Sequence, residues 1–306
     1  MEIRVLKYFL AVARFGNITK AAEELHLTQP TLSRQLTDLE NELGCQLFVR
    51  GKRHIVLTEA GSFLQARAQE IIQLADKTTA QLARNDELIA GDIYIGCGET
   101  EAMREVTAAL AKVRKNYPQI RFHLVSGNEA SITDKLQKGL LDFGLVCRET
   151  PPVEYVYRRL NYQDTWGLLM KGTNPLAGRE AVTRADLLRE PLIISRQLME
   201  SQEFDHWLNC SVKKLHIVGS YNLLHNTVFL AEQDFGSVLC FDRIVPQQTL
   251  DYGQLIFRPL TPVIHSANYL IWRKEQVFSR AGQLVKSCFD EAFLSSDTMP
   301  KEHDKE

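Results

Sequence analysis

The sequence predicts a winged helix-turn-helix, then one long helix, then an α/β domain. Residues 2–43 show apolar side chains at helical spacing in three short segments, and two short β-prone runs follow. Apolar residues then recur at alternating spacings of four and three up to about Asn85. After Gly91, strand-like and helix-like segments alternate, which is typical of a parallel α/β domain.

The composition is that of a globular protein with two or three domains. The 306 residues carry a net charge of -2, so the chain as a whole is not a polycation. Residues 1–58 hold eight lysine and arginine residues against six acidic ones, a balance of +2 that leaves -4 for the rest. A nucleic-acid site in this part would therefore need to concentrate its charge locally.

The sequence contains no signal for a metal, a cofactor or a membrane. Its six cysteines form no CxxC pair and no cluster with histidine, which argues against a zinc site and a disulfide framework. No apolar run reaches membrane-spanning length, and Arg4, Lys7 and Arg14 interrupt the N-terminal segment where a signal peptide would be apolar. We expect a cytoplasmic protein without a cofactor.

Three helices are predicted before residue 44. Gly16 suits the left-handed end of the first helix, over residues 2–15, and Asn17 or Thr19 caps the second. His26-Leu27 makes the turn, and Thr28 caps the third helix. The core face of this helix carries leucines at spacings of 4, 3 and 4, which are Leu32, Leu36, Leu39 and Leu43.

The other face of the third helix has the chemistry of a DNA recognition helix. It presents Gln29, Pro30, Ser33, Arg34 and Thr37. Glutamine and arginine can make paired hydrogen bonds to base edges. The hydroxyls of Thr28 and Ser33 can bond phosphate, helped by the helix N-terminus. The alternative is a solvated polar face.

A basic hairpin tip follows and favours the DNA interpretation. Two β-prone runs, 47–49 and 55–57, flank a segment that carries Arg50, Lys52 and Arg53. These cations can reach a phosphate backbone or a narrow minor groove. The alternative is a charged edge turn that deters aggregation, but two DNA-facing elements at this spacing argue against it.

This segment closely resembles the N-terminal domain of LysR-type transcriptional regulators. The shared residues run through Ala21-Ala22, Gln29-Pro30, Leu32-Ser33-Arg34-Gln35-Leu36, Leu43-Gly44, Leu47-Phe48, Arg50 and Leu57-Thr58-Glu59-Ala60-Gly61. The resemblance implies a dimeric DNA reader joined by a long helix to a two-lobed, periplasmic-binding-protein-like domain that senses an effector. It points to Gln29, Pro30, Ser33, Arg34 and the wing cations as DNA contacts. An activator of this family would also engage RNA polymerase.

The long helix, within a linker over residues 59–88, carries a heptad pattern. Its members are Leu64, Ala68, Ile71, Ala75, Thr78 and Leu82. Such a seam predicts a homodimer, and the resemblance is compatible with dimers pairing into tetramers. The alternative is that the seam packs on its own domain. A dimer would place two recognition helices on successive half-sites.

The α/β part follows residue 91. Strands are expected at 92–96, 120–125, 143–147, 167–170, 192–195, 215–218, 238–241 and 268–272, with helices at 99–115, 130–138, 203–208, 223–233 and 278–293. The resemblance implies that the chain returns to its first lobe. The domains are then 1–58, the linker 59–88, lobe one at 91–161 plus 266–293, lobe two at 162–265, and a polar tail at 294–306.

The loops after the strands are the expected effector site, because ligands of open α/β sheets bind beyond the carboxyl ends of strands. The first candidates are Thr100, Asn128, Arg196 and Asn222, and the second are Glu99, Arg148 and His225. Each could instead be an ordinary cap or loop residue. Glu99 and Glu101 flank Thr100 and would repel a carboxylate, so we expect an effector with a cationic or polyol group.

Two other functions were weighed. An α/β enzyme is not favoured, because the sequence has no GxSxG, Walker, complete GxGxxG or HExxH motif. A thiol-based redox sensor on the same scaffold would need a reactive thiol and a resolving partner, for which Cys210 and Cys240 are the candidates. The sequence does not determine the operator, the effector, or whether the protein activates or represses.

Overall fold

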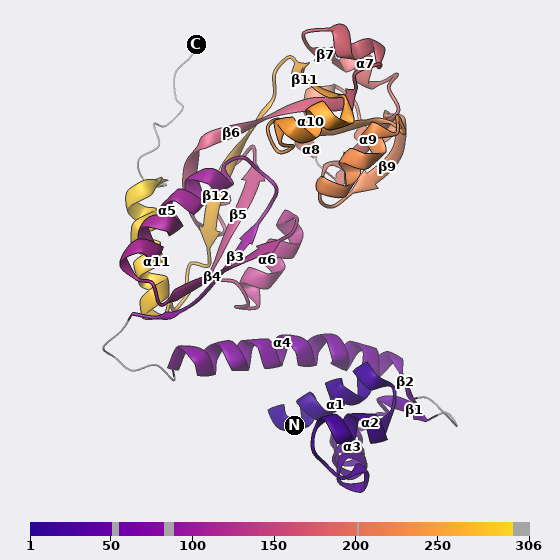
Figure 1. Ribbon diagram of the computed structural model, residues 1–306, viewed down its shortest axis with the longest axis vertical. Coiled ribbons are helices and arrows are strands. Elements are labelled where there is room, and N and C mark those ends of the chain that lie inside the picture. Colours follow the sequence, from indigo (N-terminus) through magenta and orange to yellow (C-terminus); the bar gives the residue numbers. More distant parts are fainter. Residues whose placement is uncertain (51–54, 83–88, 201, 296–306) are drawn as a thin grey trace. The chain divides into compact units, whose positions relative to one another are not determined.

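The computed structural model describes residues 1–50, 55–82, 89–200 and 202–295 (Figure 1). The chain divides into two compact units, residues 1–84 and 85–306. Among the helices in the described ranges, none is long and apolar enough to cross a membrane.

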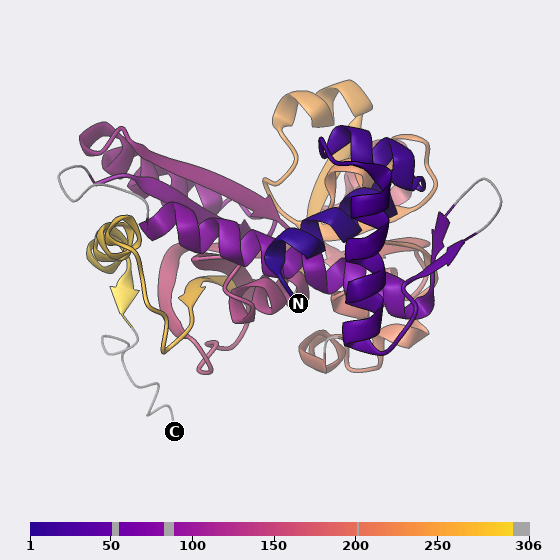
Figure 2. The ribbon, with the colours of Figure 1, turned by 90° about the horizontal axis from the view of Figure 1, so that it is seen from below.

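The first unit is a three-helix core with a hairpin and a long helix. Its elements are α1 (Ile3–Phe15), α2 (Ile18–Glu24), α3 (Gln29–Leu43), β1 (Phe48–Arg50), β2 (Ile55–Leu57) and α4 (Glu59–Leu82). The predicted ends are confirmed: Gly16 and Gly44 are left-handed at φ 59° and 67°. Asn17 and Thr28 cap the next helices, since their side chains accept from the backbone of Lys20 and Thr31. Figure 2 shows the β1–β2 hairpin standing out from the helical core.

The core of the first unit also takes in the start of α4. Leu64 is 8% exposed and Ala68 is fully buried, and both pack with the helices of the core. The predicted heptad seam is therefore wrong at these two positions, because α1 already covers that side of α4. The apolar side chains that α4 leaves exposed lie on the adjacent face and are Phe63, Ile71 and Leu74.

The second unit is built on one continuous mixed sheet, ordered β4-β3-β5-β12-β6-β10-β8-β9. The strands of lobe 1 are β3 (Gly91–Cys97), β4 (Ile120–Ser126), β5 (Phe143–Arg148), β12 (His265–Trp272) and the first half of β6 (Val156–Lys171). Helices α5 (Met103–Asn116) and α11 (Arg280–Ala292) lie side by side on one face (Figure 1). Helix α6 (Glu129–Gln137) packs on the other face.

Lobe 2 is smaller and more interrupted. Its strands are the second half of β6, β7 (Val182–Thr183), β8 (Leu192–Ser195), β9 (Ile217–Tyr221), β10 (Ser237–Phe241) and β11 (Leu255–Thr261). Its helices are α7 (Arg184–Leu187), α8 (Gln202–Leu208), α9 (Val228–Glu232) and α10 (Gln247–Gly253). Four short 3₁₀ turns complete it, η1 (Pro175–Gly178), η2 (Leu198–Glu200), η3 (Val212–Lys214) and η4 (His225–Thr227).

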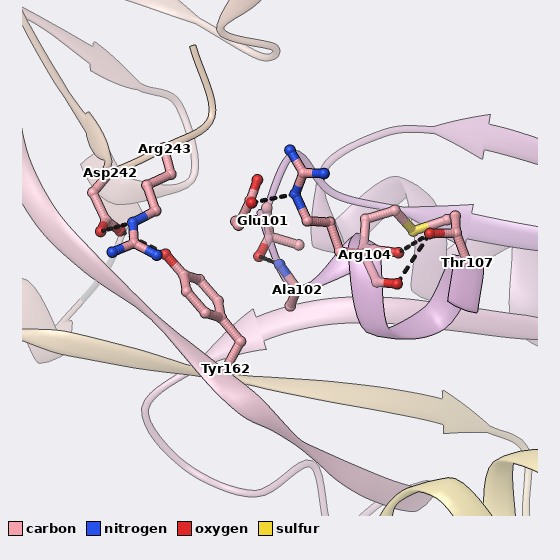
Figure 3. A network of polar contacts seen from close by, with 9 residues as sticks. Glu101, Ala102, Arg104, Thr107, Tyr162, Asp242 and Arg243 are labelled. Carbon is pink, nitrogen blue, oxygen red and sulfur yellow. Dashed lines mark hydrogen bonds and ion pairs between the residues drawn. The ribbon is translucent and has the colours of Figure 1, made fainter. Parts of the chain in front are cut away.

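Strand β6 belongs to both lobes. Residues 156–165 pair with β12, residues 166–169 pair with β10, and residues 167–171 pair with β11. At the crossing, Asp242 accepts a hydrogen bond from the Tyr162 hydroxyl at 3.2 Å (Figure 3). It also accepts one from the Thr165 backbone N–H at 2.9 Å. These contacts link lobe 1 to the loop that follows β10.

Several predicted elements differ from those observed. The strand predicted at 167–170 is the end of the much longer β6, whose first half carries polar residues that hid it. Strand β11 was not predicted, although it pairs with β6 and β7. The helix predicted at 223–233 is broken into η4 and α9. Of the predicted tail, Leu294–Ser295 form β13, which pairs with β6, and the remainder lies outside the described residues.

Candidate functional site

The polar face of α3 is presented to solvent at its N-terminal end. Gln29, Pro30, Arg34 and Thr37 are exposed and Ser33 is half-buried, whereas Leu32, Leu36 and Leu39 of the opposite face are buried. The prediction is wrong for Leu43, which is 40% exposed because it is the last residue of α3 and extends past the core. The five predicted side chains therefore share one helix face beside Thr28. Backbone N–H groups at this end favour an anion such as phosphate.

The hydrogen bonds on this face separate structural side chains from available ones. Thr28 Oγ1 caps the helix and lies 2.8 Å from Thr31 Oγ1. The Thr37 hydroxyl donates to the Ser33 carbonyl at 3.0 Å. The Arg34 side chain is 83% exposed, and its ion pair with Asp38 at 3.9 Å is long and weak. Arg34 and Gln29 can therefore reach outward to base edges.

Hydrogen bonds from backbone N–H groups of the wing hold it to the helical core. Glu40 Oε1 accepts from the backbone N–H of Leu47 at 2.7 Å and of Phe48 at 3.2 Å. Ile55 N–H donates to the Gly16 carbonyl at 2.9 Å. Arg50 lies at the end of β1, opposite Ile55. The predicted contacts Lys52 and Arg53 lie outside the described residues.

The second unit contains a cavity of about 150 Å³ between its two lobes, hereafter the cavity. Four of the seven predicted effector residues line it, namely Glu99, Asn128, Arg148 and Asn222. Asn128 also caps α6, because its side chain accepts from the backbone of Ser131 at 3.1 Å. The loops after β3, β4, β5 and β9 thus converge on one space, as expected for ligand sites of open sheets.

The other three predicted residues do not line the cavity. The Thr100 hydroxyl donates to Asp164 Oδ2 at 2.6 Å and so points into the crossing between the lobes. Arg196 is held by its backbone N–H, which donates to the Tyr221 carbonyl at 2.9 Å. The His225 ring contacts Phe229 edge to face.

Sequence reasoning missed the aromatic part of the wall. Trp166, Tyr221, Phe241 and Phe204 line the cavity, together with Gln197. Tyr221 precedes the predicted Asn222 directly, so its position in the same loop was a usable signal. Trp166 and Phe241 were not detectable in this way, because the crossing of β6 beside β10 brings them together.

The charged groups of the cavity are linked across the lobes. Arg148 Nε lies 3.4 Å from Glu129 Oε1, and its Nη1 lies 2.8 Å from Glu154. Gln197 of lobe 2 donates to Glu129 of lobe 1 at 3.1 Å. The Glu99 carboxylate of lobe 1 accepts from the backbone N–H of Leu224 in lobe 2.

A carboxyl group is fully buried behind the cavity. Asp164 Oδ2 accepts from Asn268 at 2.7 Å and from the Cys147 thiol at 3.6 Å, in addition to Thr100. Burial raises the pKa of Asp164. Burial also raises the pKa of the Cys147 thiol, which disfavours a reactive thiolate there.

The sequence matches two family descriptions that together cover most of the chain. Residues 3–62 match "Bacterial regulatory helix-turn-helix protein, lysR family", and residues 86–293 match "LysR substrate binding domain". The chain belongs to the LysR family.

Curated relatives match from somewhat more than half of the chain to nearly its whole length. The chain is 34% identical over 283 residues to the Hca operon transcriptional activator HcaR of Escherichia coli K12, covering 90% of this chain and 93% of HcaR. It is 34% identical over 182 residues to the nitrogen assimilation regulatory protein nac of Klebsiella aerogenes, 58% of each chain. The structure of CbnR, a LysR family transcriptional regulator, matches with a TM-score of 0.71 at 21% identity, covering 96% of this chain and all of CbnR. CbnR in complex with its target DNA gives a TM-score of 0.69 and shows the same fold.

The protein is therefore a LysR-type DNA-binding transcriptional regulator with a C-terminal effector-binding domain. Regulators of this type are generally not enzymes. The thiol-sensor alternative gains no support from the positions of its cysteines. Cys210 packs with one core cluster of lobe 2 and Cys240 belongs to the other. Burial raises the pKa of Cys240, so its thiolate is disfavoured.

Proposed function

We propose that this LysR-family regulator acts as a cytoplasmic homodimer that reads an operator with α3 and the wing and responds to a small effector in the cavity. The observation that carries the proposal is the exposed α3 face, on which Gln29 and Arg34 are free of strong internal partners within the described part of the chain. A rigid three-helix core holds this face. Such a helix N-terminus fits the major groove.

The proposed contacts divide by chemistry. Gln29, Ser33 and Arg34 read base edges, because amide, hydroxyl and guanidinium groups match the major-groove pattern. Thr28, Pro30 and Thr37 line the same face. The wing residues Arg50, Lys52 and Arg53 grip the phosphate backbone or the minor groove.

The proposed dimer forms along α4. Phe63, Ile71 and Leu74 are 65%, 37% and 42% exposed, and their spacings of eight and three place them on one helix face. Burying this apolar stripe against a second copy stabilises a dimer. A dimer presents two α3 helices to two half-sites of the DNA. The half-sites are then separated by about one turn of the DNA helix, or by a multiple of one turn. Dimers that pair into tetramers, and contact with RNA polymerase at activated promoters, complete the proposal.

The effector site is proposed to be the cavity, lined by Glu99, Asn128, Arg148 and Asn222 with an aromatic wall. It lies between the two lobes, where a bound molecule contacts both and can bias their arrangement. Thr100, Arg196 and His225 lie outside its lining and are not proposed as direct ligand contacts.

The test is a genome-wide binding map followed by footprinting of the purified chain on the recovered DNA. We expect protection of two half-sites in register with the DNA helix, and affinity that falls steeply with salt because phosphate contacts release counterions. Loss of protection in the Arg34→Ala variant supports the assigned face. A chain that protects no discrete sequence at low salt contradicts the proposed function.

A further inference from the structure

The cavity is negatively charged. Of its lining residues that the structure describes, Glu99, Glu129 and Glu149 are acidic and Arg148 is basic. Their formal charges give a balance of -2. Because interactions between charges strengthen where water is scarce, this balance opposes a second anion and favours a cation.

The arginine of the wall already interacts with carboxylates of the chain. Arg148 lies within ion-pair distance of both Glu129 and Glu154. A ligand carboxylate would have to displace one of them to reach the guanidinium. The first turn of α6, which would otherwise attract an anion, itself begins with Glu129. The positive groups of the cavity are thus neutralised internally.

Glu99 is the carboxylate best placed to receive a cation. It accepts from the backbone of Leu224, and no lysine, arginine or histidine of the described ranges forms an ion pair with it. A ligand ammonium beside Glu99 would make a charge-assisted hydrogen bond, which is about twice as strong as a neutral one.

Much of the remaining wall is apolar, and the polar atoms of its Trp166 and Tyr221 are already hydrogen-bonded. The Trp166 indole N–H donates to Ser266 at 3.0 Å, and the Tyr221 hydroxyl donates to the Leu239 carbonyl at 2.8 Å. Phe241 lies against Trp166, with ring centroids 4.3 Å apart. These rings therefore offer apolar surface and faces that attract cations. A cavity of about 150 Å³ suits a body of roughly one six-membered ring.

We propose that the effector is an organic cation, a protonated amine carried on an apolar body of about one ring, with its ammonium group beside Glu99 and its ring against Trp166 and Phe241. This inference rests on the proposed role of the cavity as the effector site. It also gives a role to Glu99 in the loop after β3, and of the two groups expected from the sequence, a cation or a polyol, it selects the cation.

The test compares three probes of one size by isothermal titration calorimetry on the full chain: benzylamine, benzyl alcohol and benzoate. We expect benzylamine to bind, benzyl alcohol to bind at least about tenfold more weakly, and benzoate not to bind, since replacing a charge-assisted bond by a neutral one costs about that much. Tighter binding of benzoate than of benzylamine, or no binding by any probe, overturns the proposal.

Matched variants locate the interaction. Glu99→Gln keeps an acceptor for the Leu224 N–H, so the fold is retained while the charge is lost. Benzylamine should bind this variant about tenfold more weakly, and the affinity for benzyl alcohol should be unchanged. Glu101→Gln, two residues away and outside the cavity, where it pairs with Arg104, should leave both affinities unchanged. Unchanged benzylamine binding in Glu99→Gln contradicts the assignment. Operator footprints of the same preparations test the regulator function separately, so either idea can fail alone.

Discussion

Glu40 Oε1 accepts a hydrogen bond from the backbone N–H of Leu47 at 2.7 Å, and this contact fastens the wing to α3. The same oxygen accepts from Phe48 at 3.2 Å. One carboxylate on α3 thus sets where β1 begins. The distance from the exposed polar face of α3 to the wing is fixed by the same contact.

Glu40→Ala should therefore destabilise the first unit by about 2 kcal/mol, because two N–H groups lose a charged acceptor. Hydrogen exchange followed by mass spectrometry should show faster exchange at residues 47–50 and 55–57. Glu23→Ala, on the exposed surface of α2, is the control and should leave exchange in the wing unchanged. Equal exchange in the two variants would mean that the Glu40 contact adds no stability.

Arg34→Ala should lower the affinity for the operator because a paired contact to a base is lost. The difference in binding free energy between operator and random DNA should shrink by about 1–3 kcal/mol.

Lys52→Ala, by contrast, should weaken binding to all sequences about equally. The slope of log affinity against log salt concentration should fall by about one. Binding assays on operator and random duplexes at several salt concentrations measure both effects. If the two variants behave like the parent, the contact face is assigned wrongly.

Gly61→Ala should destabilise the first unit severely, by about 3 kcal/mol or more, because an added methyl group has no room. A Cβ at this position would lie 2.1 Å from the Leu47 carbonyl oxygen. Circular dichroism during denaturant titration measures the loss. Gln69→Ala, on an exposed part of the same helix, should change stability by less than about 0.5 kcal/mol.

Leu74→Asp should convert the proposed dimer to a monomer, because a carboxylate would be buried in the apolar stripe of α4. Light scattering after gel filtration measures the mass. Gln69→Asp, which also adds negative charge to α4 but lies on an exposed part of the helix away from the apolar stripe, should remain dimeric. A dimeric Leu74→Asp chain would place the interface elsewhere.

Asp164→Asn should change how the stability of the second unit depends on pH. Burial raises the pKa of Asp164 above its ordinary value of 3.8, so below that value the carboxyl is protonated in both the folded and unfolded states. As pH rises, the carboxyl ionises first in the unfolded chain, which favours unfolding. The free energy of unfolding of the unsubstituted protein therefore falls until the pH passes the pKa of Asp164 in the folded state. The parent should therefore lose stability relative to Asp164→Asn as pH rises from about 4. Tryptophan fluorescence reports this unit alone, since Trp166, Trp207 and Trp272 all lie within it. A relative gain in stability would show that the three donors to Asp164 outweigh its burial.

Local chemistry explains why the first unit was predictable. Helices α1 and α3 end at glycines in the left-handed conformation, and the side chains of Asn17 and Thr28 cap α2 and α3. Leu32, Leu36 and Leu39 follow one face of α3. These signals act within one or two turns of the chain, so the helices and the polar face of α3 could be predicted before any packing was known. The heptad pattern was less reliable, because Leu64 and Ala68 fit a seam equally well whether α1 or a second copy covers it.

The sequence by itself determined the order of domains, the helix carrying Gln29 and Arg34, and the loops from which Glu99, Asn128, Arg148 and Asn222 reach the cavity. Only the tertiary structure decided that Thr100 turns toward Asp164, that Arg148 is partnered by Glu129 and Glu154, and that Trp166 meets Phe241. The reason is that Thr100 and Asp164, like Trp166 and Phe241, are far apart in the chain and meet only through β6. The partners of Arg148 come from α6 and from the loop after β5, whose packing the sequence pattern does not report. The spacing of apolar residues predicts which residues share a face of one helix or strand. The charge and shape of a cavity depend instead on which helices and strands pack together.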